Sequence, residues 1–350
     1  MNRKQIRYLG CTALVVASGL TGIPSANAAN AHVVHPGESI QKAVDAAKKG
    51  DTILIEPGTY RESVRITKSG LTIRGSGKRT VLKPATKAGN SCATAGNGIC
   101  VEGTSAKPVT GTTVRSLVLS GYKKNGLWAT NTDGLTVRWV TAEKNGNWGF
   151  AEERSVRSLF EGNAARDNGE SGLFLSNTVS TEAGAKDARG TLVRHNALTG
   201  NRIGITVRRL RNVTVEENEL AGNCGGVFVV GDENKPRAGN IAVRGNSVHE
   251  NNKYCAKTAR LPFVQGAGIV LTGVEKSVVE HNDIRDNVGK SPFSGGVVLY
   301  KSMVGASSDH NVVRDNQLTG NSADLANRDT GKGNTFDHNT CRRSEPAGMC

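Results

Sequence analysis

Apolar and polar residues recur along this chain with a period of about 22 residues. The segments 191–207 and 214–229 follow one pattern: an apolar residue, two variable residues, Asn, a variable residue, an apolar residue, two variable residues and Asn. A glycine and a short run of alternating apolar residues follow in both. Val193 and Val215 are 22 residues apart, which is too short for a domain and typical of one repeat of a solenoid.

The pattern continues from residue 114 to the C-terminus. The second asparagine of the pattern recurs as Asn125, Asn145, Asn168, Asn201, Asn223, Asn251, Asn287 and Asn321. The first recurs as Asn163, Asn196, Asn218, Asn246, Asn282, Asn316 and Asn339. An apolar residue lies three positions before the first slot in every repeat: Leu117, Val137, Phe160, Val193, Val215, Val243, Val279, Val313 and Phe336. We expect the repeats to stack about 4.8 Å apart and to bury one continuous core.

The asparagines favour a structural interpretation. Asparagine tolerates the left-handed conformation that tight corners need, and its amide can bond to the asparagine of the next coil as a ladder. Two residues before the first slot the charge alternates in every repeat: Arg138, Glu161, Arg194, Glu216, Arg244, Glu280, Arg314 and Asp337. We expect these side chains to form a ladder of ion pairs on a solvent face, although a binding surface is the alternative.

Insertions interrupt the repeats on both sides of the strand that begins with glycine after the second asparagine, such as residues 204–208. Insertions are expected at 178–190, 231–240 and 301–309 after this strand, and at 253–266 and 288–295 before it. Insertions of a solenoid usually lie on its working face. The strand is therefore predicted to be the floor of a groove walled by loops.

The N-terminal part predicts a cap. Ser39 can begin a helix over 40–47, in which Ile40, Ala43, Val44 and Ala47 share one face. Short strands broken by glycine follow, including Thr52-Ile-Leu-Ile and Gly58-Thr-Tyr-Arg-Glu. With these residues the chain resembles the pectin lyase-like superfamily. The resemblance implies an all-β fold, a single-domain right-handed parallel β-helix with an N-terminal capping helix, and its handedness agrees with the general preference for right-handed crossovers.

The chain thus divides into four segments. Residues 1–28 read as a secretory signal peptide, with Arg3, Lys4 and Arg7 before a short apolar run and Ala26-Asn-Ala as its cleavage signal. Residues 29–83 form the cap and first coils, 84–113 a disulfide-pinned loop, and 114–350 the repeats of the same continuous domain. We expect a secreted, extracellular protein, a monomer, without a membrane span or a nucleic-acid partner.

Charge and cysteine content agree with an extracellular protein. The formal charge is +14 and falls to +11 without the three basic residues of the signal peptide, which suggests an acidic polysaccharide partner or else serves solubility alone. Without Cys11 six cysteines remain, and in an oxidising compartment we expect the disulfides Cys92–Cys100, Cys224–Cys255 and Cys341–Cys350. The cysteine and histidine spacing does not indicate a zinc site.

Two outward columns are predicted on the groove floor. The first holds Trp128, Ala151, Phe174, Thr206, Phe228, Val270 and Val298, and the second holds Thr130, Glu153, Ser176, Arg208, Val230, Thr272 and Tyr300. Aromatic side chains could stack on sugars, and guanidinium or ammonium groups could meet carboxylates. The substrate-binding candidates are Trp128, Phe174, Arg209, Arg211, Tyr300 and Lys301. The alternative is that loops cover the aromatic rings and that solvent surrounds the arginines.

The catalytic candidates are Arg208, Glu153 and Glu152. Glu152 falls in an inward column with Ala129 and Leu175, where a carboxylate should be neutral, paired or catalytic; a local bulge that turns it outward is the preferred explanation.

The superfamily resemblance implies a carbohydrate-active enzyme, with a polysaccharide lyase as the first candidate. Such a lyase needs a base and often calcium, for which Glu152, Glu153 and Glu170 are the available carboxylates. The motifs of the family's known enzymes are missing, so the alternative is a non-catalytic protein that binds glycans or a cell surface.

Overall fold

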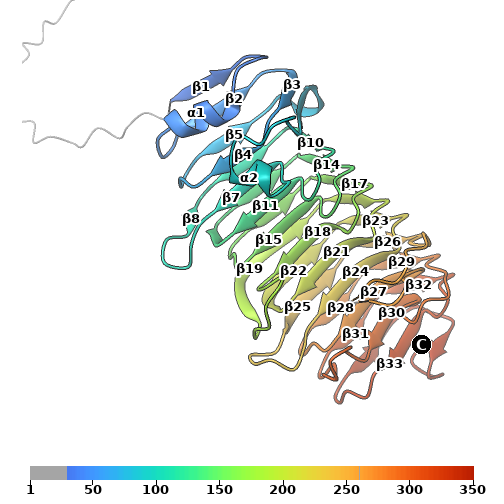
Figure 1. The fold of residues 1–350 in the computed structure, drawn as a ribbon. Helices are drawn as coiled ribbons and strands as arrows, with labels where there is room; N and C mark the ends of the chain where they lie inside the picture. Colours follow the sequence, from blue (N-terminus) through green and yellow to red (C-terminus); the bar gives the residue numbers. More distant parts are fainter. Residues whose placement is uncertain (1–29, 260) are drawn as a thin grey trace, which may run out of the picture.

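The chain winds into a long coil of short parallel strands (Figure 1). The computed structural model describes residues 30–259 and 261–350, so the predicted signal peptide lies outside the described residues. In this part of the chain the strands form three long sheets of 12, 10 and 11 members and one sheet of two strands. From residue 52 to residue 328 each turn of the coil contributes to the first, second and third sheet in order, which is a parallel β-helix.

The first sheet contains, in spatial order, β1 (Ala31–Val34), β2 (Thr52–Ile55), β5 (Thr72–Arg74), β9 (Thr113–Arg115), β13 (Thr136–Arg138), β16 (Leu159–Glu161), β19 (Lys186–Arg194), β22 (Leu210–Glu216), β25 (Gly239–Arg244), β28 (Val278–Glu280), β31 (Val312–Arg314) and β34 (Thr335–Asp337). The second contains β3 (Gly58–Arg61), β6 (Thr80–Lys83), β10 (Val118–Ser120), β14 (Thr141–Glu143), β17 (Ala164–Arg166), β20 (Ala197–Thr199), β23 (Glu219–Ala221), β26 (Ser247–His249), β29 (Asp283–Arg285) and β32 (Gln317–Thr319).

The third sheet contains β4 (Val64–Ile66), β7 (Ile99–Glu102), β11 (Leu127–Thr130), β15 (Phe150–Glu153), β18 (Ser171–Ser176), β21 (Ile203–Arg208), β24 (Gly225–Val230), β27 (Ala267–Thr272), β30 (Gly295–Tyr300), β33 (Leu325–Arg328) and β35 (Ser344–Glu345). The small sheet pairs β8 (Val109–Thr110) with β12 (Thr132–Asp133). The helical segments are α1 (Ile40–Ala46), a 3₁₀ turn (Gly77–Arg79) and α2 (Ser91–Thr94).

The predicted stacking of the repeats is confirmed. Val193 pairs with Val215 and Val215 with Val243 in adjacent strands of the first sheet, and all three side chains are buried. The predicted capping helix is α1, whose start is capped by Ser39 accepting a hydrogen bond from the backbone of Lys42. Ile40 and Val44 of this helix are buried over the first coils, so α1 covers the open end of the core (Figure 1).

The asparagine ladder is confirmed, but its conformational explanation was wrong. Asn196 donates to the side-chain oxygen of Asn218 at 2.8 Å, and Asn218 donates to that of Asn246 at 3.0 Å. The left-handed residue at these corners is the one before the asparagine, such as His195 with φ 54°. The preceding residue makes the turn, and the asparagine amide is thereby directed along the axis to the next coil.

The alternating charges also lie as predicted. Arg138 and Arg194 both contact Glu161 at 2.6 Å, one from each adjacent strand. Further along, Arg244 contacts Glu216 at 2.8 Å and Arg314 contacts Glu280 at 2.7 Å. The arginines of these pairs are half-buried or exposed and the glutamates half-buried, so solvent still screens each pair and each contributes little to stability. A slip by one coil would bring like charges together.

Segment 84–113 differs from the predicted loop. It contains α2, β7 and β8 and the start of β9, and β7 pairs in register with β4 and β11. The expected disulfide between Cys92 and Cys100 is present, as are those between Cys224 and Cys255 and between Cys341 and Cys350. The glycine and small polar residues of this segment do not predict a strand. Strand β7 forms nevertheless, because β4 and β11 pair with it on both sides.

None of the helical segments among residues 30–259 and 261–350 has the length and apolar character of a membrane span.

Candidate functional site

The outer face of the third sheet carries the two predicted columns in register. Phe174 pairs with Thr206, and Thr206 with Phe228, in consecutive strands. The second column follows in the same way, from Ser176 to Arg208 to Val230. The alternation of strand side chains therefore places both columns on the face away from the core.

A cavity of about 770 Å³ lies on this face over β18, β21, β24, β27 and β30. Its walls come from the predicted insertions: Val179 and Glu182, Asp232, and Met303 on one side, and Leu261 and Phe293 on the other. The disulfide Cys224–Cys255 ties the second wall to the start of β24. The predicted position of the groove is confirmed, and its volume is in the usual range of ligand sites.

Three aromatic rings stack at one end of the groove. Trp148 lies between Trp128 and Phe174, with ring centroids 6.1 and 4.3 Å apart and interplanar angles of 16° and 10°. In the floor column the residue between Trp128 and Phe174 is Ala151, so Trp148 occupies the space above this small side chain. Sequence reasoning missed Trp148, although Ala151 between two rings was the available signal.

This stack changes the expected role of Trp128. One face of its indole is taken by Trp148, and Trp128 does not line the cavity. Phe174 does line it, together with Trp148 and Thr206. Trp148 and Phe174 of the stack therefore border the groove, and Trp128 does not.

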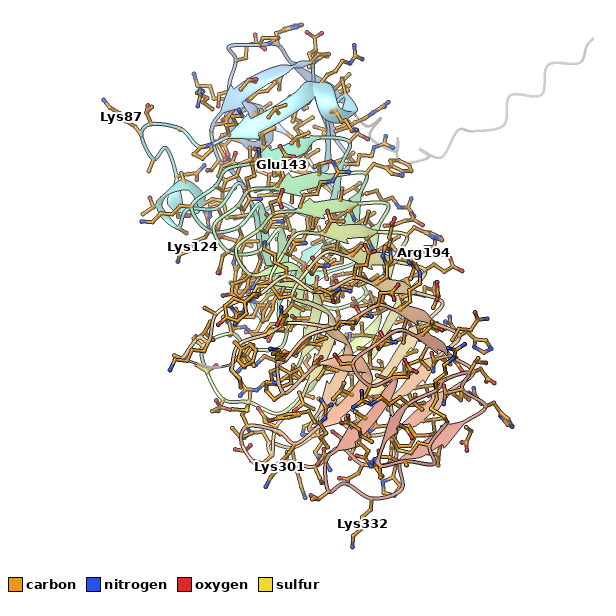
Figure 2. All side chains as sticks on the ribbon, turned by 90° about the vertical axis from the view of Figure 1, so that its right-hand side faces the viewer. Lys87, Lys124, Glu143, Arg194, Lys301 and Lys332 are labelled. Carbon is orange, nitrogen blue, oxygen red and sulfur yellow. A yellow bond between two sulfur atoms is a disulfide. The ribbon has the colours of Figure 1, made fainter. Side chains whose placement is uncertain are left out.

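The basic candidates separate into three kinds. Arg208 lines the cavity and donates to the carbonyl of Val179 at 3.3 Å. Arg209 also borders the cavity, but it is buried and pairs with Asp232 and Glu182, so it joins two wall loops. Lys301 is exposed and points to solvent (Figure 2).

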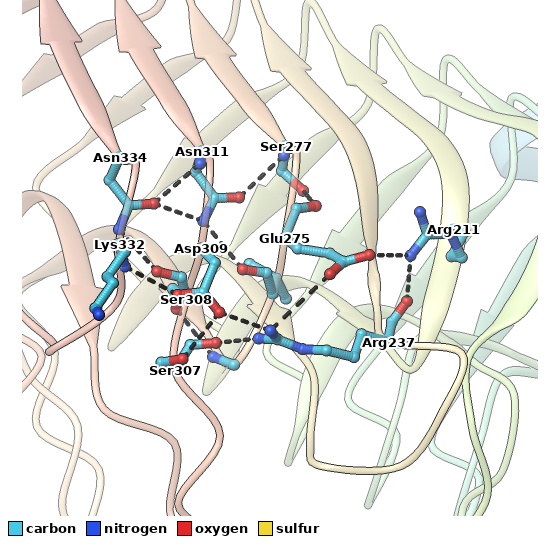
Figure 3. A network of polar contacts seen from close by, with 12 residues as sticks. Arg211, Arg237, Glu275, Ser277, Ser307, Ser308, Asp309, Asn311, Lys332 and Asn334 are labelled. Atoms are coloured by element: carbon cyan, nitrogen blue, oxygen red, sulfur yellow. Dashed lines mark hydrogen bonds and ion pairs between the residues drawn. The ribbon is translucent and has the colours of Figure 1, made fainter.

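Arg211 lies away from the groove floor, in a network that includes Arg237 and Asp309 of the wall loops 231–240 and 301–309 (Figure 3). Arg211 contacts Glu275 at 2.9 Å and donates to the carbonyl of Arg237 at 2.5 Å. Arg237 donates to Asp309 at 2.6 Å. Burial would raise the pKa of Asp309, but hydrogen bonds from Arg237, the Lys332 backbone and Ser307 lower it to about 2. Arg211 is thus a structural residue and not a substrate contact.

Replacing Arg237 with alanine is expected to loosen the loop 301–309 and to lower the free energy of unfolding by about 2 kcal/mol, because it removes charge-assisted hydrogen bonds. Hydrogen exchange should accelerate in 301–309 while the strands of the first sheet stay protected. Arg314→Ala, in an exposed ion pair, is the control and should change stability by less than about 1 kcal/mol. Unchanged exchange in 301–309 would contradict the role of the network.

The glutamate candidates do not meet in the groove. Glu153 is buried, contacts Arg154 at 2.9 Å and accepts a hydrogen bond from the Val179 backbone at 3.0 Å, so it positions a wall loop. Glu152 faces the core in register between Ala129 and Leu175 and is 2% exposed. The preferred bulge is therefore wrong, and an interior side chain cannot touch a polysaccharide, which removes Glu152 from the catalytic candidates.

Glu170 was expected only as a possible calcium ligand, but it is the glutamate among the three candidates that borders the cavity floor. It lines the cavity, lies 3.7 Å from Arg202, and burial raises its pKa although Arg202 lowers it. Six residues of extended chain separate position 170 from position 176, which pairs with Arg208, or about 20 Å at the usual rise. Glu170 and Arg208 therefore lie at opposite sides of the groove.

The carboxylates considered as calcium ligands do not come together in the part of the chain that the structure describes. This part contains no group of three or more His, Cys, Asp or Glu side chains that could hold a metal ion. Glu152 lies in the core, Glu153 accepts a hydrogen bond from a wall loop, and Glu170 lines the groove.

Comparisons with known proteins agree with the geometry. A family model described as a right-handed β-helix region matches residues 64–236 and 186–350. No curated protein matches the chain.

Similar solved structures include a DFA-IIIase from Arthrobacter chlorophenolicus A6 without its lid, at 13% identity, 85% of this chain, 86% of that chain and a TM-score of 0.51. The Dettilon tailspike protein is 12% identical over 87% of this chain and 66% of that chain, with a TM-score of 0.52. An alginate lyase of the PL6 family is 12% identical over 85% of this chain and 45% of that chain, with a TM-score of 0.53. At such identities the likeness shows the fold alone.

Proposed function

Since the chain belongs to the family of right-handed β-helix proteins, we propose that it is a secreted protein that takes an extracellular, acidic polysaccharide into the groove of its third sheet. The observation that carries this proposal is the order of groups on the floor. Phe174, Thr206 and Arg208 offer an aromatic ring, a hydroxyl and a guanidinium along one face. A uronic acid unit presents an apolar ring face, hydroxyls and a carboxylate.

The spacing on the floor suits one sugar unit. Phe174 and Thr206 belong to adjacent strands, about 4.8 Å apart, and Thr206 and Arg208 are two residues apart on one strand, about 6.6 Å. Aromatic faces bind sugar rings through their apolar C–H groups, and a guanidinium can hold a carboxylate with two parallel hydrogen bonds. A neighbour whose name is alginate lyase shares this fold, which supports the proposed ligand class.

The proposal that the protein is secreted is supported by the N-terminal sequence and by the disulfides. The N-terminal segment has the composition of a signal peptide. Three disulfides close in the described part of the chain, and such bonds persist in oxidising compartments.

The reaction proposed first is β-elimination at a uronate: the proton next to the carboxylate passes to water, the bond between the ring and the glycosidic oxygen breaks, a carbon–carbon double bond forms, and the leaving oxygen takes a proton from water. Arg208 is the catalytic residue of this step because its guanidinium neutralises the carboxylate, which makes the neighbouring proton more acidic. The second candidate is binding without catalysis. It is favoured by the positions of Glu152 in the core and Glu153 under a loop, because neither can take part in proton transfer in the groove.

The test uses the mature full chain and a panel of acidic and neutral polysaccharides. Wild type should be retarded in gels containing an acidic polymer, and elimination would add products that absorb ultraviolet light. Arg208→Ala should weaken retention about tenfold to hundredfold, since loss of a charge pair in a site is worth about 2 kcal/mol or more. Phe174→Ala should weaken it as well.

Arg314→Ala removes the same charge from an exposed pair on the first sheet and should leave retention unchanged. Retention with ultraviolet-absorbing products supports the lyase, and retention without them supports the binding protein. The proposal is overturned when wild type retains none of the acidic polymers, or when Arg208→Ala binds them as well as wild type does.

A further inference from the structure

The two ends of the groove differ in chemistry. Over β18 and β21 the lining residues Trp148, Phe174, Ser171, Glu170 and Arg208 combine rings with hydroxyl and charged groups, with Glu170 and Arg208 on opposite sides of the groove. Toward β27 and β30 the lining is largely apolar and includes Phe228, Val230, Leu261, Phe293, Tyr300, Met303 and Val304, with Thr258, Thr272 and Ser302 as polar members. Both ends belong to one cavity, so a single ligand can reach both.

The apolar end is built around Phe293. Its ring lies 5.4 Å from that of Phe228 and 4.8 Å from that of Tyr300, edge to face in both contacts. Phe228 and Phe293 are buried, and they belong to a small hydrophobic cluster on the outer face of the third sheet. Tyr300 is half-buried and borders the cavity. The apolar wall at this end is therefore a packed cluster on the third sheet and does not depend on the loops alone.

Two further apolar side chains stand at the rim of this end. Met303 is 61% exposed and Val304 is 56% exposed, and both line the cavity. Exposed apolar side chains that gather at a cavity usually mark a ligand contact. The network of Arg237 and Asp309 holds the base of the same loop (Figure 3), so the rim is presented on an anchored segment.

An unsubstituted sugar suits this end poorly. Thr258, Thr272 and Ser302 border this end, but most of its wall comes from apolar side chains such as Phe228, Phe293 and Met303, which offer no partner to a hydroxyl group that leaves water. An unpaired polar group is unfavourable in such surroundings. An alkyl group would gain about 0.8 kcal/mol for each CH₂ removed from water.

We propose that the natural ligand is an acidic polysaccharide that carries ester-linked acyl groups, and that the apolar end of the groove is an acyl subsite. This inference rests on the proposed function, because it adds a substituent to the same ligand. The sugar unit occupies the end with Phe174 and Arg208, and the acyl chain points toward Phe293 with Met303 and Val304 over it.

The experiment compares one acidic polysaccharide that wild type retains with the same polymer after partial O-butyrylation. The butyrylated form should bind about tenfold more tightly, which corresponds to two buried CH₂ groups. The double variant Met303→Ser with Val304→Ser should lose this gain and keep the affinity for the unmodified polymer. Val288→Ser, at an exposed valine outside this cavity, should keep both.

The outcomes separate the two proposals. Equal binding of both polymers by wild type, or a gain that survives in the double variant, overturns the acyl subsite and leaves the polysaccharide function intact. If wild type retains neither polymer, the proposed function itself fails. Binding of neutral phospholipid vesicles that the double variant loses, with no gain from butyrylation, would assign the apolar end to lipid and overturn the acyl subsite.

Discussion

Replacing Asn218 with alanine should lower the free energy of unfolding by about 3 kcal/mol or more. Asn218 is buried and donates to Asn246 and to the backbone oxygen of Val193, each at 3.0 Å. Its own oxygen accepts from the backbone and the amide of Asn196, at 3.0 and 2.8 Å. Alanine leaves several of these buried groups without a partner, and each such group costs about 1–3 kcal/mol.

Asn339 provides the matched control because it ends the same ladder. It accepts from Asn316 at 2.9 Å, but it is only partly buried, so water can replace its bonds. Asn339→Ala should reduce stability by about 1 kcal/mol or less. Urea unfolding of both variants measures the difference, and equal losses would contradict the claim that the ladder derives its strength from burial.

The ladder also explains why so much of the fold could be predicted. A stacked coil repeats its neighbours along the axis, so Val193, Val215 and Val243 occupy equivalent positions in sequence and in space. Local spacing thus determines long-range contacts, and the register of the groove floor follows from it. Ordinary folds lack this link between sequence period and position.

The parts that could not be predicted depend on contacts between unlike segments. Arg209 was expected in the groove as a sugar contact, but Asp232 and Glu182 from two different insertions pair with it. Trp148 enters the aromatic stack from a turn and not from a floor strand. Insertions do not repeat, so the period of the sequence contains no information on their partners.

The prediction for Glu152 was wrong for a different reason. The repeat period correctly placed Glu152 in an inward column, but its charge led us to prefer a bulge that would turn it outward. Its side chain has an oxygen without a hydrogen-bond partner among the described residues, and burial raises its pKa to about 7 from the ordinary 4.5. The solenoid keeps the register of β15 because a bulge would disturb the pairing with β11 and β18 on both sides. The coil therefore accepts one unfavourable side chain in its core.

Replacing Glu152 with leucine should raise the free energy of unfolding by about 3 kcal/mol at pH 8. Between pH 4.5 and about 7 the folded wild type holds a proton on Glu152 that the unfolded chain has lost, so its stability falls as the pH rises through this window. A difference of about 2.5 pKa units corresponds to about 3 kcal/mol. Leucine also removes an unpaired polar group and matches Leu175 in the adjacent strand.

The neighbouring Glu153 offers a control of opposite sign. Glu153→Leu removes the acceptor for the Val179 backbone and the partner of Arg154, so it should destabilise the protein by about 1–3 kcal/mol. Thermal unfolding from pH 4 to pH 8 should show the decline of wild type flattened in Glu152→Leu and retained in Glu153→Leu. A decline that persists in Glu152→Leu would mean that another group titrates in this window, because leucine at position 152 holds no proton.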